Sequence, residues 1–521
     1  MDRFAPVLIS ILFLSLFLGG CGSAAKSVPD TEDTTSFDFD ASLDRFVSAS
    51  VPAGISVHDP SILKADGKYY IFGSHMAAAV SDDLRNWTYI GNGYKVSNPV
   101  FLDLMKNEEA FSYAGNKHSL IRTDDGGWHV WAPDVIYNRA MGKYVMYFCT
   151  SSTWNASNLC YAVSETPDGP YVWQGALIYS GFTEATLPHT DVLQYVKEDY
   201  AREHYMKSAS EYNFDDYPNA IDPTVFYDHE GRMWMVYGSW SGGIFLLEID
   251  ENTGKVIHPA ADEEHRVDPY FGKKLLGGGH HSIEGPYIIY NERTGYYELY
   301  VSYGGLNREG GYQIRVYRSK TVDGDYADMN GKYPGKNTDH ANDGLKLSGN
   351  YMLPSLPVAY MATGHNSAFA DDDGKRYLCF HTRFDNATEE HEVRVHQYFT
   401  NEEGWPCLLP YETNGETVTE TGYPMEKMAG RYYIIDQGTA IDATIIEPVV
   451  IYLTEAGNVY DKYGKAGTWV AKEKSSFMHM EINGITYSGV FCEMKDEAGT
   501  DVFVFTAAGN NESLWGVKYD Q

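Results

Sequence analysis

The sequence predicts an all-β protein: a five-bladed β-propeller followed by a small C-terminal β-barrel or sandwich domain. Of the 521 residues, 14% are aromatic and 50 are Gly, a mixture typical of chains rich in strands and turns. Between residues 50 and 410, a Gly-containing turn followed by a Tyr-rich strand recurs five times. Beyond about residue 430, short runs alternate apolar and polar residues, as half-buried strands do.

The N-terminus predicts export and a lipid anchor. Residues 5–18 are almost wholly apolar, a run shorter than the roughly 20 residues of a permanent membrane helix. The sequence LGGC, ending at Cys21, follows directly and resembles the bacterial lipobox, whose cysteine is lipidated. We therefore expect residues 1–21 to be a lipoprotein signal peptide. An ordinary cleaved signal with a chance cysteine is the alternative.

Residues 22–48 are small, polar and acidic, and they predict a disordered tether. The body of the protein is then expected in the cell envelope, anchored to a membrane through Cys21 and facing away from the cytoplasm. The formal net charge of −32 excludes nucleic acid as a natural partner, because the phosphate backbone would be repelled. We expect a monomer.

Five turn glycines organise residues 49–415, the predicted propeller. They are spaced by 75, 89, 64 and 79 residues, each interval long enough for one four-stranded antiparallel blade with its loops. Each glycine is expected to allow the turn between two strands of a hairpin. The five are Gly67, Gly142, Gly231, Gly295 and Gly374.

A titratable residue stands eight to eleven positions before each turn glycine. These residues are Asp59, Asp134, Asp222, Glu284 and His365. If each begins the innermost strand of its blade, all five converge on the central axis. Gathered carboxylates raise one another's pKa, so such convergence indicates a functional site. The alternative is that each acidic residue merely caps a turn.

Three further features complete the expected organisation. Residues 190–218 are charged, Tyr-rich and helix-like, and they are expected to cap the propeller face near Asp222. Residues 425–521 predict the small β domain, whose role in packing or in gripping a polymer stays open. After Cys21, the remaining five cysteines show no close pair and are expected to be buried free thiols; a bridge between Cys149 and Cys160 is the alternative.

The motifs around these residues resemble those of glycoside hydrolase family 43, and specifically of its two-domain endo-1,5-α-L-arabinanases. The resemblance covers residue 50 to the end of the chain. It rests on HDPSI, WAPDVIY, NAIDPTVFYD, YGSWSGGIFLLEID, SIEGPYIIY and GHNSAF. The resemblance implies hydrolysis of α-1,5 links in arabinan, a plant polymer, with inversion at the anomeric carbon.

Carried over by position, the resemblance implies that Asp59 is the general base and Glu284 the general acid. Asp222 matches the third carboxylate, which raises the pKa of the acid and orients it. An inverting glycosidase holds its two carboxyl groups roughly 6.5–9.5 Å apart to leave room for water. Asp134 has no catalytic counterpart and is interpreted as structural or substrate-shaping.

The resemblance also implies that His365 helps to hold a calcium ion ligated otherwise largely by water. It places five residues at the arabinose subsite next to the cleaved bond, with the indole of one available to stack on a furanose ring. These are Asn219, Ile221, Gly238, Ser239 and Trp240.

Two alternatives to an endo-acting arabinanase stay open. Loops at the blade edges determine whether the site is a groove or a pocket, so an exo-acting arabinofuranosidase or β-xylosidase of the same family is the closer one. A non-catalytic carbohydrate-binding surface lipoprotein is the more distant one, and the presence of Asp59, Asp222 and Glu284 argues against it.

Overall fold

The computed structural model describes residues 34–44, 46–49, 54–102, 104, 106, 108–336 and 340–519. The predicted signal peptide, Cys21 and residues 22–33 of the predicted tether lie outside these residues. Residues 39–521 form one compact unit, distinct from residues 1–38. Within the described ranges, no helix is long and apolar enough to cross a membrane.

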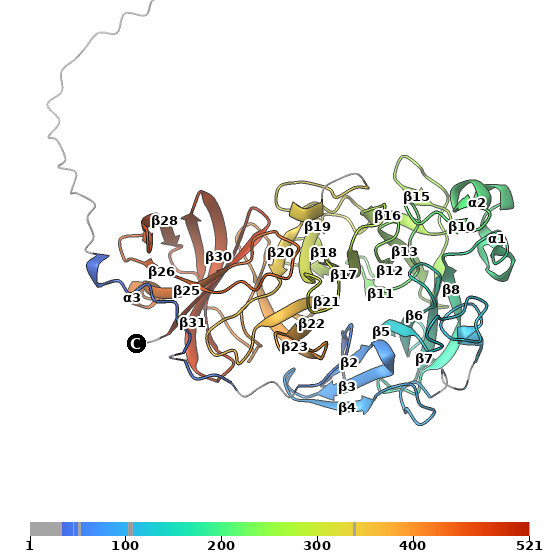
Figure 1. Cartoon of the computed structure of the whole chain (residues 1–521), viewed down its shortest axis with the longest axis horizontal. Coiled ribbons are helices and arrows are strands. Elements are labelled where there is room, and N and C mark those ends of the chain that lie inside the picture. The colour runs from blue at the N-terminus through green and yellow to red at the C-terminus, as the bar shows by residue number, and fades with distance from the viewer. Residues whose placement is uncertain are drawn as a thin grey trace, which may run out of the picture. The chain divides into compact units, whose positions relative to one another are not determined.

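Five antiparallel sheets follow one another along the described chain and are arranged around a common centre (Figure 1). Blade 1 contains β1 (Ser61–Ala65), β2 (Lys68–Gly73), β3 (Ala77–Ser81) and β4 (Trp87–Gly91). Blade 2 contains β5 (Val130–Asn138), β6 (Lys143–Ser151), β7 (Ser157–Ser164) and β8 (Val172–Tyr179). In both blades the strands pair in chain order.

Blade 3 is enlarged to six strands. It contains β11 (Thr224–Tyr227), β12 (Met233–Tyr237), β13 (Ile244–Asp250), β14 (Lys255–Ile257), β15 (Val267–Asp268) and β16 (Gly272–Leu276). Blade 4 contains β17 (Ile283–Asn291), β18 (Tyr296–Tyr303), β19 (Gln313–Ser319) and β20 (Leu345–Ser348). Blade 5 contains β21 (Tyr360–Ala370), β22 (Arg376–Phe384), β23 (His391–Thr400) and β24 (Pro406–Leu408).

The five turn glycines lie where the sequence predicts them. Each separates the first two strands of its blade and has a positive φ, from 65° at Gly142 to 86° at Gly231. An L side chain is strained in this conformation. The prediction of a five-bladed propeller is confirmed.

The helix-like segment of residues 190–218 forms two short α-helices rather than one, α1 (Val192–Tyr195) and α2 (Glu198–His204), followed by β9 (Met206–Ser208) and β10 (Glu211–Tyr212). The short helix η4 (Leu187–His189) precedes it. Helix α1 ends because Val196 is extended, with φ −129° and ψ 156°. The other short helices are η1 (Thr34–Ser36), η2 (Ser74–Met76), η3 (Glu108–Phe111), η5 (His340–Asn342) and α3 (Met425–Met428).

The C-terminal domain is a closed eight-stranded antiparallel barrel, which decides between the two predicted forms. It closes because β25 pairs with both β26 and β32. Its strands are β25 (Gly430–Asp436), β26 (Val449–Leu453), β27 (Asn458–Asp461), β28 (Gly464–Ala471), β29 (Phe477–Ile482), β30 (Ile485–Lys495), β31 (Asp501–Gly509) and β32 (Glu512–Tyr519).

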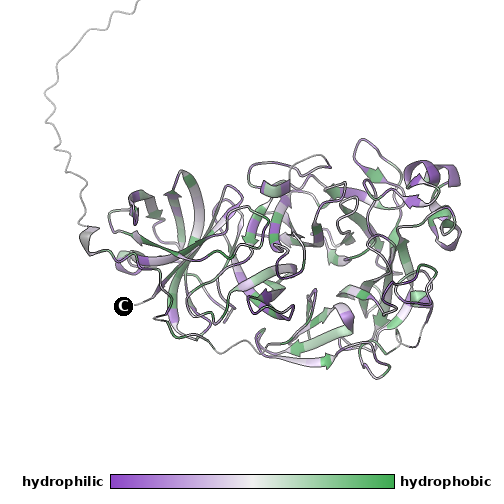
Figure 2. Ribbon diagram, in the orientation of Figure 1, coloured by the Kyte–Doolittle hydropathy of each residue, from purple (hydrophilic) through white to green (hydrophobic). Residues whose placement is uncertain are grey.

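Barrel and propeller share a hydrophobic core. Trp515 and Val504 of the barrel join Leu378 and Leu408 of blade 5 in one cluster of buried side chains. Hydrophobic residues are concentrated in the strands, whereas the helical region around α2 is mostly hydrophilic (Figure 2). The five described cysteines are free and buried, as expected.

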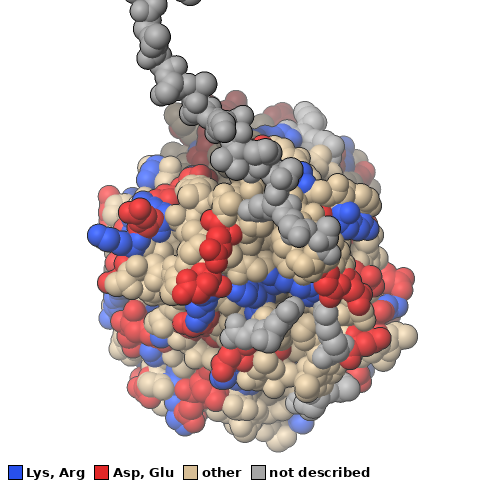
Figure 3. Space-filling view, turned by 90° about the vertical axis from the view of Figure 1, so that its left-hand side faces the viewer, with Lys and Arg blue, Asp and Glu red and all other residues tan. Residues whose placement is uncertain are grey.

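The last part of the predicted tether lies on the barrel. The ring of Phe39 packs edge-on to Tyr452, and the ring of Phe46 packs against Tyr433 and Tyr519. On the face over the barrel, Lys and Arg are interspersed with Asp and Glu (Figure 3). The strong net acidity of the chain is therefore not gathered into one acidic area on this face.

Candidate active site

The three predicted catalytic carboxylates and the predicted metal ligand line one cavity of about 350 Å³. Asp59, Asp222, Glu284 and His365 are all at most 8% exposed. Blades 1, 3, 4 and 5 each supply one of them, as the repeat pattern predicts. Blade 2 contributes the cavity wall through Trp131 and the β6–β7 loop.

The backbone is strained or irregular where these residues stand. Asp59, Asp222 and His365 have φ values of 54°, 54° and 47°. The pairing of β17 shifts register directly after Glu284, and that of β21 shifts twice between Met361 and Ser367, the stretch that contains His365. Bulges and left-handed residues redirect side chains at strand ends, so blades 1, 3, 4 and 5 turn these four residues toward the centre.

Two glycines are required by close approach. Gly285 has a φ of 58°, and a Cβ on it would lie 3.1 Å from the His365 ring. Gly238 has a φ of 120°, and a Cβ there would meet the carbonyl oxygen of Gly243 at 2.5 Å. Glycine at 285 thus lets the acidic residue of blade 4 and the histidine of blade 5 share the centre.

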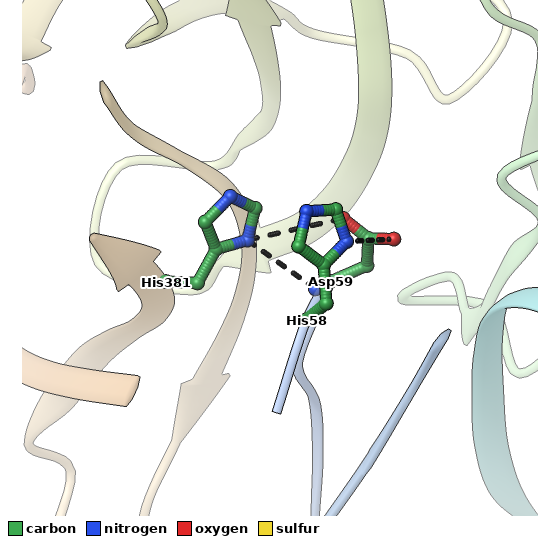
Figure 4. Close-up of side chains that lie close together, drawn as sticks. All are labelled: His58, Asp59 and His381. Atoms are coloured by element: carbon green, nitrogen blue, oxygen red, sulfur yellow. Dashed lines mark hydrogen bonds and ion pairs between the residues drawn. The ribbon is translucent and has the colours of Figure 1, made fainter. Parts of the chain in front are cut away.

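Histidines surround Asp59 (Figure 4). Its Oδ1 lies 3.0 Å from Nδ1 of His365 and 3.8 Å from Nδ1 of His381, and its Oδ2 lies 2.8 Å from Nδ1 of His58. Ser74 Oγ donates a further short hydrogen bond. Burial by itself would raise the pKa of Asp59, but His365, His58 and His381 outweigh it and hold the pKa well below its usual value.

Asp222 and Glu284 form a pair of buried carboxyl groups that differ in the number of hydrogen bonds they accept. Glu284 accepts hydrogen bonds from Ser239 Oγ at 3.0 Å, Trp240 Nε1 at 2.8 Å and Tyr312 Oη at 2.8 Å. Asp222 accepts one, from the Gly285 N–H at 3.1 Å.

Burial raises the pKa of Asp222 well above its usual value, and the Glu284 and Asp59 carboxylates raise it further. Two neighbouring buried carboxyl groups resist double ionisation, so the Asp222 and Glu284 pair favours retention of a proton.

A loop of the barrel buttresses this hydrogen-bond network. Tyr312 follows Gly311, where a Cβ would meet the backbone of Asp442 at 2.7 Å. Gln313 donates to the carbonyl oxygen of Ala440 at 3.0 Å. The β25–β26 loop therefore packs directly behind the tyrosine that holds Glu284.

Asp134 lies between blades rather than in the cavity. It accepts hydrogen bonds from Ser61 Oγ of blade 1 and from the Val225 N–H of blade 3. Burial raises the pKa of Asp134 to about 7. This arrangement favours the structural interpretation, because one carboxyl ties three blades together.

The subsite predictions divide into two groups. Asn219 and Ile221 line the cavity. Ser239 and Trp240 donate to Glu284, and Gly238 holds the chain by donating to the carbonyl oxygen of Ile221 at 2.9 Å. Their contact with a sugar stays a prediction.

Sequence reasoning missed several residues of the site. His58 adjoins Asp59 in HDPSI, and His381 lies in the strand that follows the fifth turn glycine, but neither spacing indicated a role. Trp154, which lines the cavity and is 53% exposed, lies in the β6–β7 loop. Tyr312 has no sequence signal, since it lies 28 residues from Glu284.

The side chains around His365 supply few oxygen ligands for calcium. The oxygens of the described residues that contact the His365 ring are Oδ1 of Asp59, 3.0 Å from Nδ1, and Tyr312 Oη, 3.5 Å from Nδ1. Calcium takes six to eight oxygen ligands, so an ion here fits only if water completes its shell. His58, Asp59 and His381 form the one described group with metal-ligand spacing, and its two imidazoles do not suit calcium.

Comparison with known proteins agrees with this geometry. Residues 53–191 and 196–406 match the description "Glycosyl hydrolases family 43", and residues 410–516 match "C-terminal lipocalin-like domain". The chain is 36% identical over 483 residues to the extracellular endo-α-(1→5)-L-arabinanase of Thermotoga petrophila, covering 89% of this chain and 94% of the relative.

The chain is also 37% identical over 483 residues to extracellular endo-α-(1→5)-L-arabinanase 2 of Bacillus subtilis, covering 89% of this chain and 93% of the relative. The crystal structure of the endo-1,5-α-L-arabinanase from Thermotoga petrophila superposes with a TM-score of 0.77 at 36% identity, over 91% of this chain and 100% of that one. With family 43 matched across the whole propeller and close relatives along nearly the full length, this chain belongs to glycosyl hydrolase family 43.

Proposed function

We propose that the protein is an inverting endo-arabinanase that cleaves α-1,5-L-arabinofuranosidic links in arabinan. The observation that carries the proposal is one cavity lined by Asp59, Asp222 and Glu284. The neighbouring histidines hold the pKa of Asp59 low, whereas burial and the neighbouring carboxylates raise the pKa of Asp222. An inverting glycosidase needs this combination, because one carboxylate activates water while a carboxylic acid protonates the leaving oxygen.

In the proposed reaction Asp59 is the general base and Glu284 the general acid. Asp59 accepts a proton from water as that water attacks the anomeric carbon, and Glu284 donates a proton to the departing sugar oxygen. Asp222 forms a carboxyl pair with Glu284, and repulsion between the two charges favours retention of a proton on the pair. Ser239, Trp240 and Tyr312 fix the orientation of the Glu284 carboxyl group.

The substrate proposal rests on the named activity of the relatives and on the cavity walls. The two relatives described above, at 36% and 37% identity, are named endo-arabinanases. Trp131 and Trp154 present indole rings to the cavity, and flat aromatic faces suit the C–H groups of furanose rings. Asn219 supplies amide hydrogen-bonding groups, and Ile221 an apolar surface.

Calcium at His365 remains part of the proposal. When bound, the ion would supply a fixed positive charge near Asp59, with water as most of its ligands. In its absence the His365 ring performs one function by itself: its Nδ1 lies against Asp59 and keeps that carboxylate ionised.

The location is proposed on two grounds. The named relatives are extracellular, and the first 21 residues resemble a lipoprotein signal peptide. We propose that the protein acts outside the cytoplasm as a monomer, attached to a membrane through lipidated Cys21, where a polymeric substrate is accessible.

The proposal is tested by Glu284→Gln and Asp59→Asn. Each variant should lose turnover of linear arabinan by roughly 10²–10⁴-fold, the usual contribution of an acid or base, while still binding the polymer. Glu251→Gln, whose side chain only accepts from Tyr227 Oη, is the control and should keep full activity. NMR of the first product should show the inverted anomer. Binding without turnover by the unaltered protein would instead support the carbohydrate-binding lipoprotein.

A further inference from the structure

A second cavity, of about 440 Å³, lies at the enlarged third blade. It is lined by residues of α2, β15 and β16 and by the segment 333–336. We propose that this cavity binds a distal stretch of the same arabinofuranose polymer whose cleavage site is the central cavity. The inference rests on the proposed function and extends it to a second contact along the chain.

Three tyrosine rings form part of the cavity wall. Tyr200, Tyr217 and Tyr333 all line it, and each is partly exposed. The guanidinium carbon of Arg266 lies 4.4 Å from the Tyr333 ring centre. Tyrosines that combine a flat apolar face with a polar tip are well suited to sugar rings.

Two polar atoms of this cavity have no partner among the described residues. The Tyr333 hydroxyl and the Arg266 Nε are buried, and neither makes a hydrogen bond there. Leaving a buried donor unsatisfied costs free energy. A ligand rich in hydroxyl groups that displaces these two lining side chains slightly would reach and satisfy both atoms.

The charges of the lining balance, so the cavity favours a neutral ligand. Lys336 pairs with Asp216 at 2.6 Å, and Lys274 donates to the carbonyl oxygen of Asp216 at 2.7 Å. Asp268 accepts from Tyr205 Oη at 2.9 Å. The full charged set is Arg266, Lys274 and Lys336 against Asp216, Glu263 and Asp268.

A neutral polyhydroxy chain is therefore a better match for this cavity than an anion or a cation. Its volume lies within the roughly 300–1,000 Å³ typical of ligand sites.

The cavity adjoins the rim of the central site. The Gly279 N–H donates to the carbonyl oxygen of Asp215 at 2.6 Å, and Gly277 pairs with Gly335. His280, which follows Gly279, packs its ring against those of Trp154 and Trp240. One short segment thus connects the aromatic rim of the central site to the lining of the second cavity, and a long chain lying on Trp154 would continue toward it.

The test is a comparison of a long and a short substrate. Tyr333→Phe removes only the unpartnered hydroxyl, and Tyr200→Ala removes a ring. Tyr463→Ala is the matched control, because Tyr463 is 85% exposed on the barrel and lies outside the cavity. Initial rates are measured on linear α-1,5-arabinan and on α-1,5-arabinotriose. Polymer binding is measured by affinity electrophoresis in the Glu284→Gln background.

We expect Tyr200→Ala and Tyr333→Phe to weaken polymer binding roughly 3- to 10-fold, as for loss of an aromatic or hydrogen-bonding contact. Arabinotriose turnover should stay unchanged. Polymer binding equal to that of the Tyr463→Ala control in both variants would overturn the distal site while leaving the proposed function intact. Failure of the unaltered protein to cleave either substrate would overturn the proposed function itself.

Discussion

Tyr312 is expected to position Glu284 for proton donation, and Tyr312→Phe tests this. The side chain is fully buried, and its hydroxyl donates to Glu284 Oε1 at 2.8 Å. Phenylalanine keeps the ring and removes only this donor. Glu284 would then keep Ser239 and Trp240, which both donate to its other oxygen, Oε2. Oε1 would lose the hydroxyl that donates to it, so the Glu284 carboxyl group would rotate more freely.

The magnitude follows from the kind of bond removed. A hydrogen bond to a charged group contributes about 1.5–3 kcal/mol, which corresponds to roughly 10- to 150-fold in rate. Because two donors remain, we expect the lower end, about 10-fold in kcat on arabinan, with little change in KM. An aryl arabinoside with a good leaving group needs less protonation, so its kcat should fall less.

Tyr303→Phe is the matched control for this substitution. Tyr303 is equally buried, but its hydroxyl bonds to Tyr317 Oη at 2.5 Å, away from the cavity. It should change melting temperature by a similar amount and leave kcat intact. The reasoning is refuted if Tyr312→Phe keeps kcat within 2-fold of the unaltered protein, or if both variants and both substrates respond alike.

Three other predictions follow from the site. Gly285→Ala should lower kcat at least 10-fold, because a Cβ would press on the His365 ring. Gly67 also has a positive φ, but a Cβ there would meet no atom within 4 Å, so Gly67→Ala should lower only the stability. Measuring kcat together with melting temperature distinguishes the two effects. Asp134 has a pKa raised to about 7, so its stabilising contribution is complete below about pH 4 and is lost as pH rises through 7. Asp134→Asn should therefore flatten the decline of melting temperature between pH 4 and 8, and an unchanged slope would contradict this. Thorough chelation should lower activity or melting temperature of the unaltered protein and leave His365→Gln unaffected; an unchanged profile in the unaltered protein counts against calcium.

The fold was predictable because the repeat is encoded locally. Each turn needs a glycine at a positive φ, and the neighbouring strands need Tyr and β-branched residues, so both leave a periodic pattern. The offset of Asp59, Asp222 and Glu284 from those glycines likewise predicted that they meet in one cavity. The enlargement of blade 3 to six strands was not visible, because its extra strands are two or three residues long.

Partners drawn from distant strands were not predictable. His381 reaches Asp59 from another blade, 322 residues along the chain, and Tyr312 reaches Glu284 with support from the barrel. Such contacts depend on how blades pack, which no local pattern encodes.

Residues 39–46 show a related limit. Their polar and acidic composition predicts a tether, yet Phe39 and Phe46 each find an aromatic partner on the barrel. Two rings in a short polar stretch carry little weight in composition, but each buries a large apolar area when a partner surface is present.

The most direct test of the central claim is the length distribution of early products from linear α-1,5-arabinan, using a soluble form that lacks residues 1–21. An endo-acting arabinanase predicts a spread of mid-length oligosaccharides from the first time points. Arabinose or one short product from the outset would contradict endo action and indicate an exo-acting member of family 43. Binding without any product would contradict catalysis altogether.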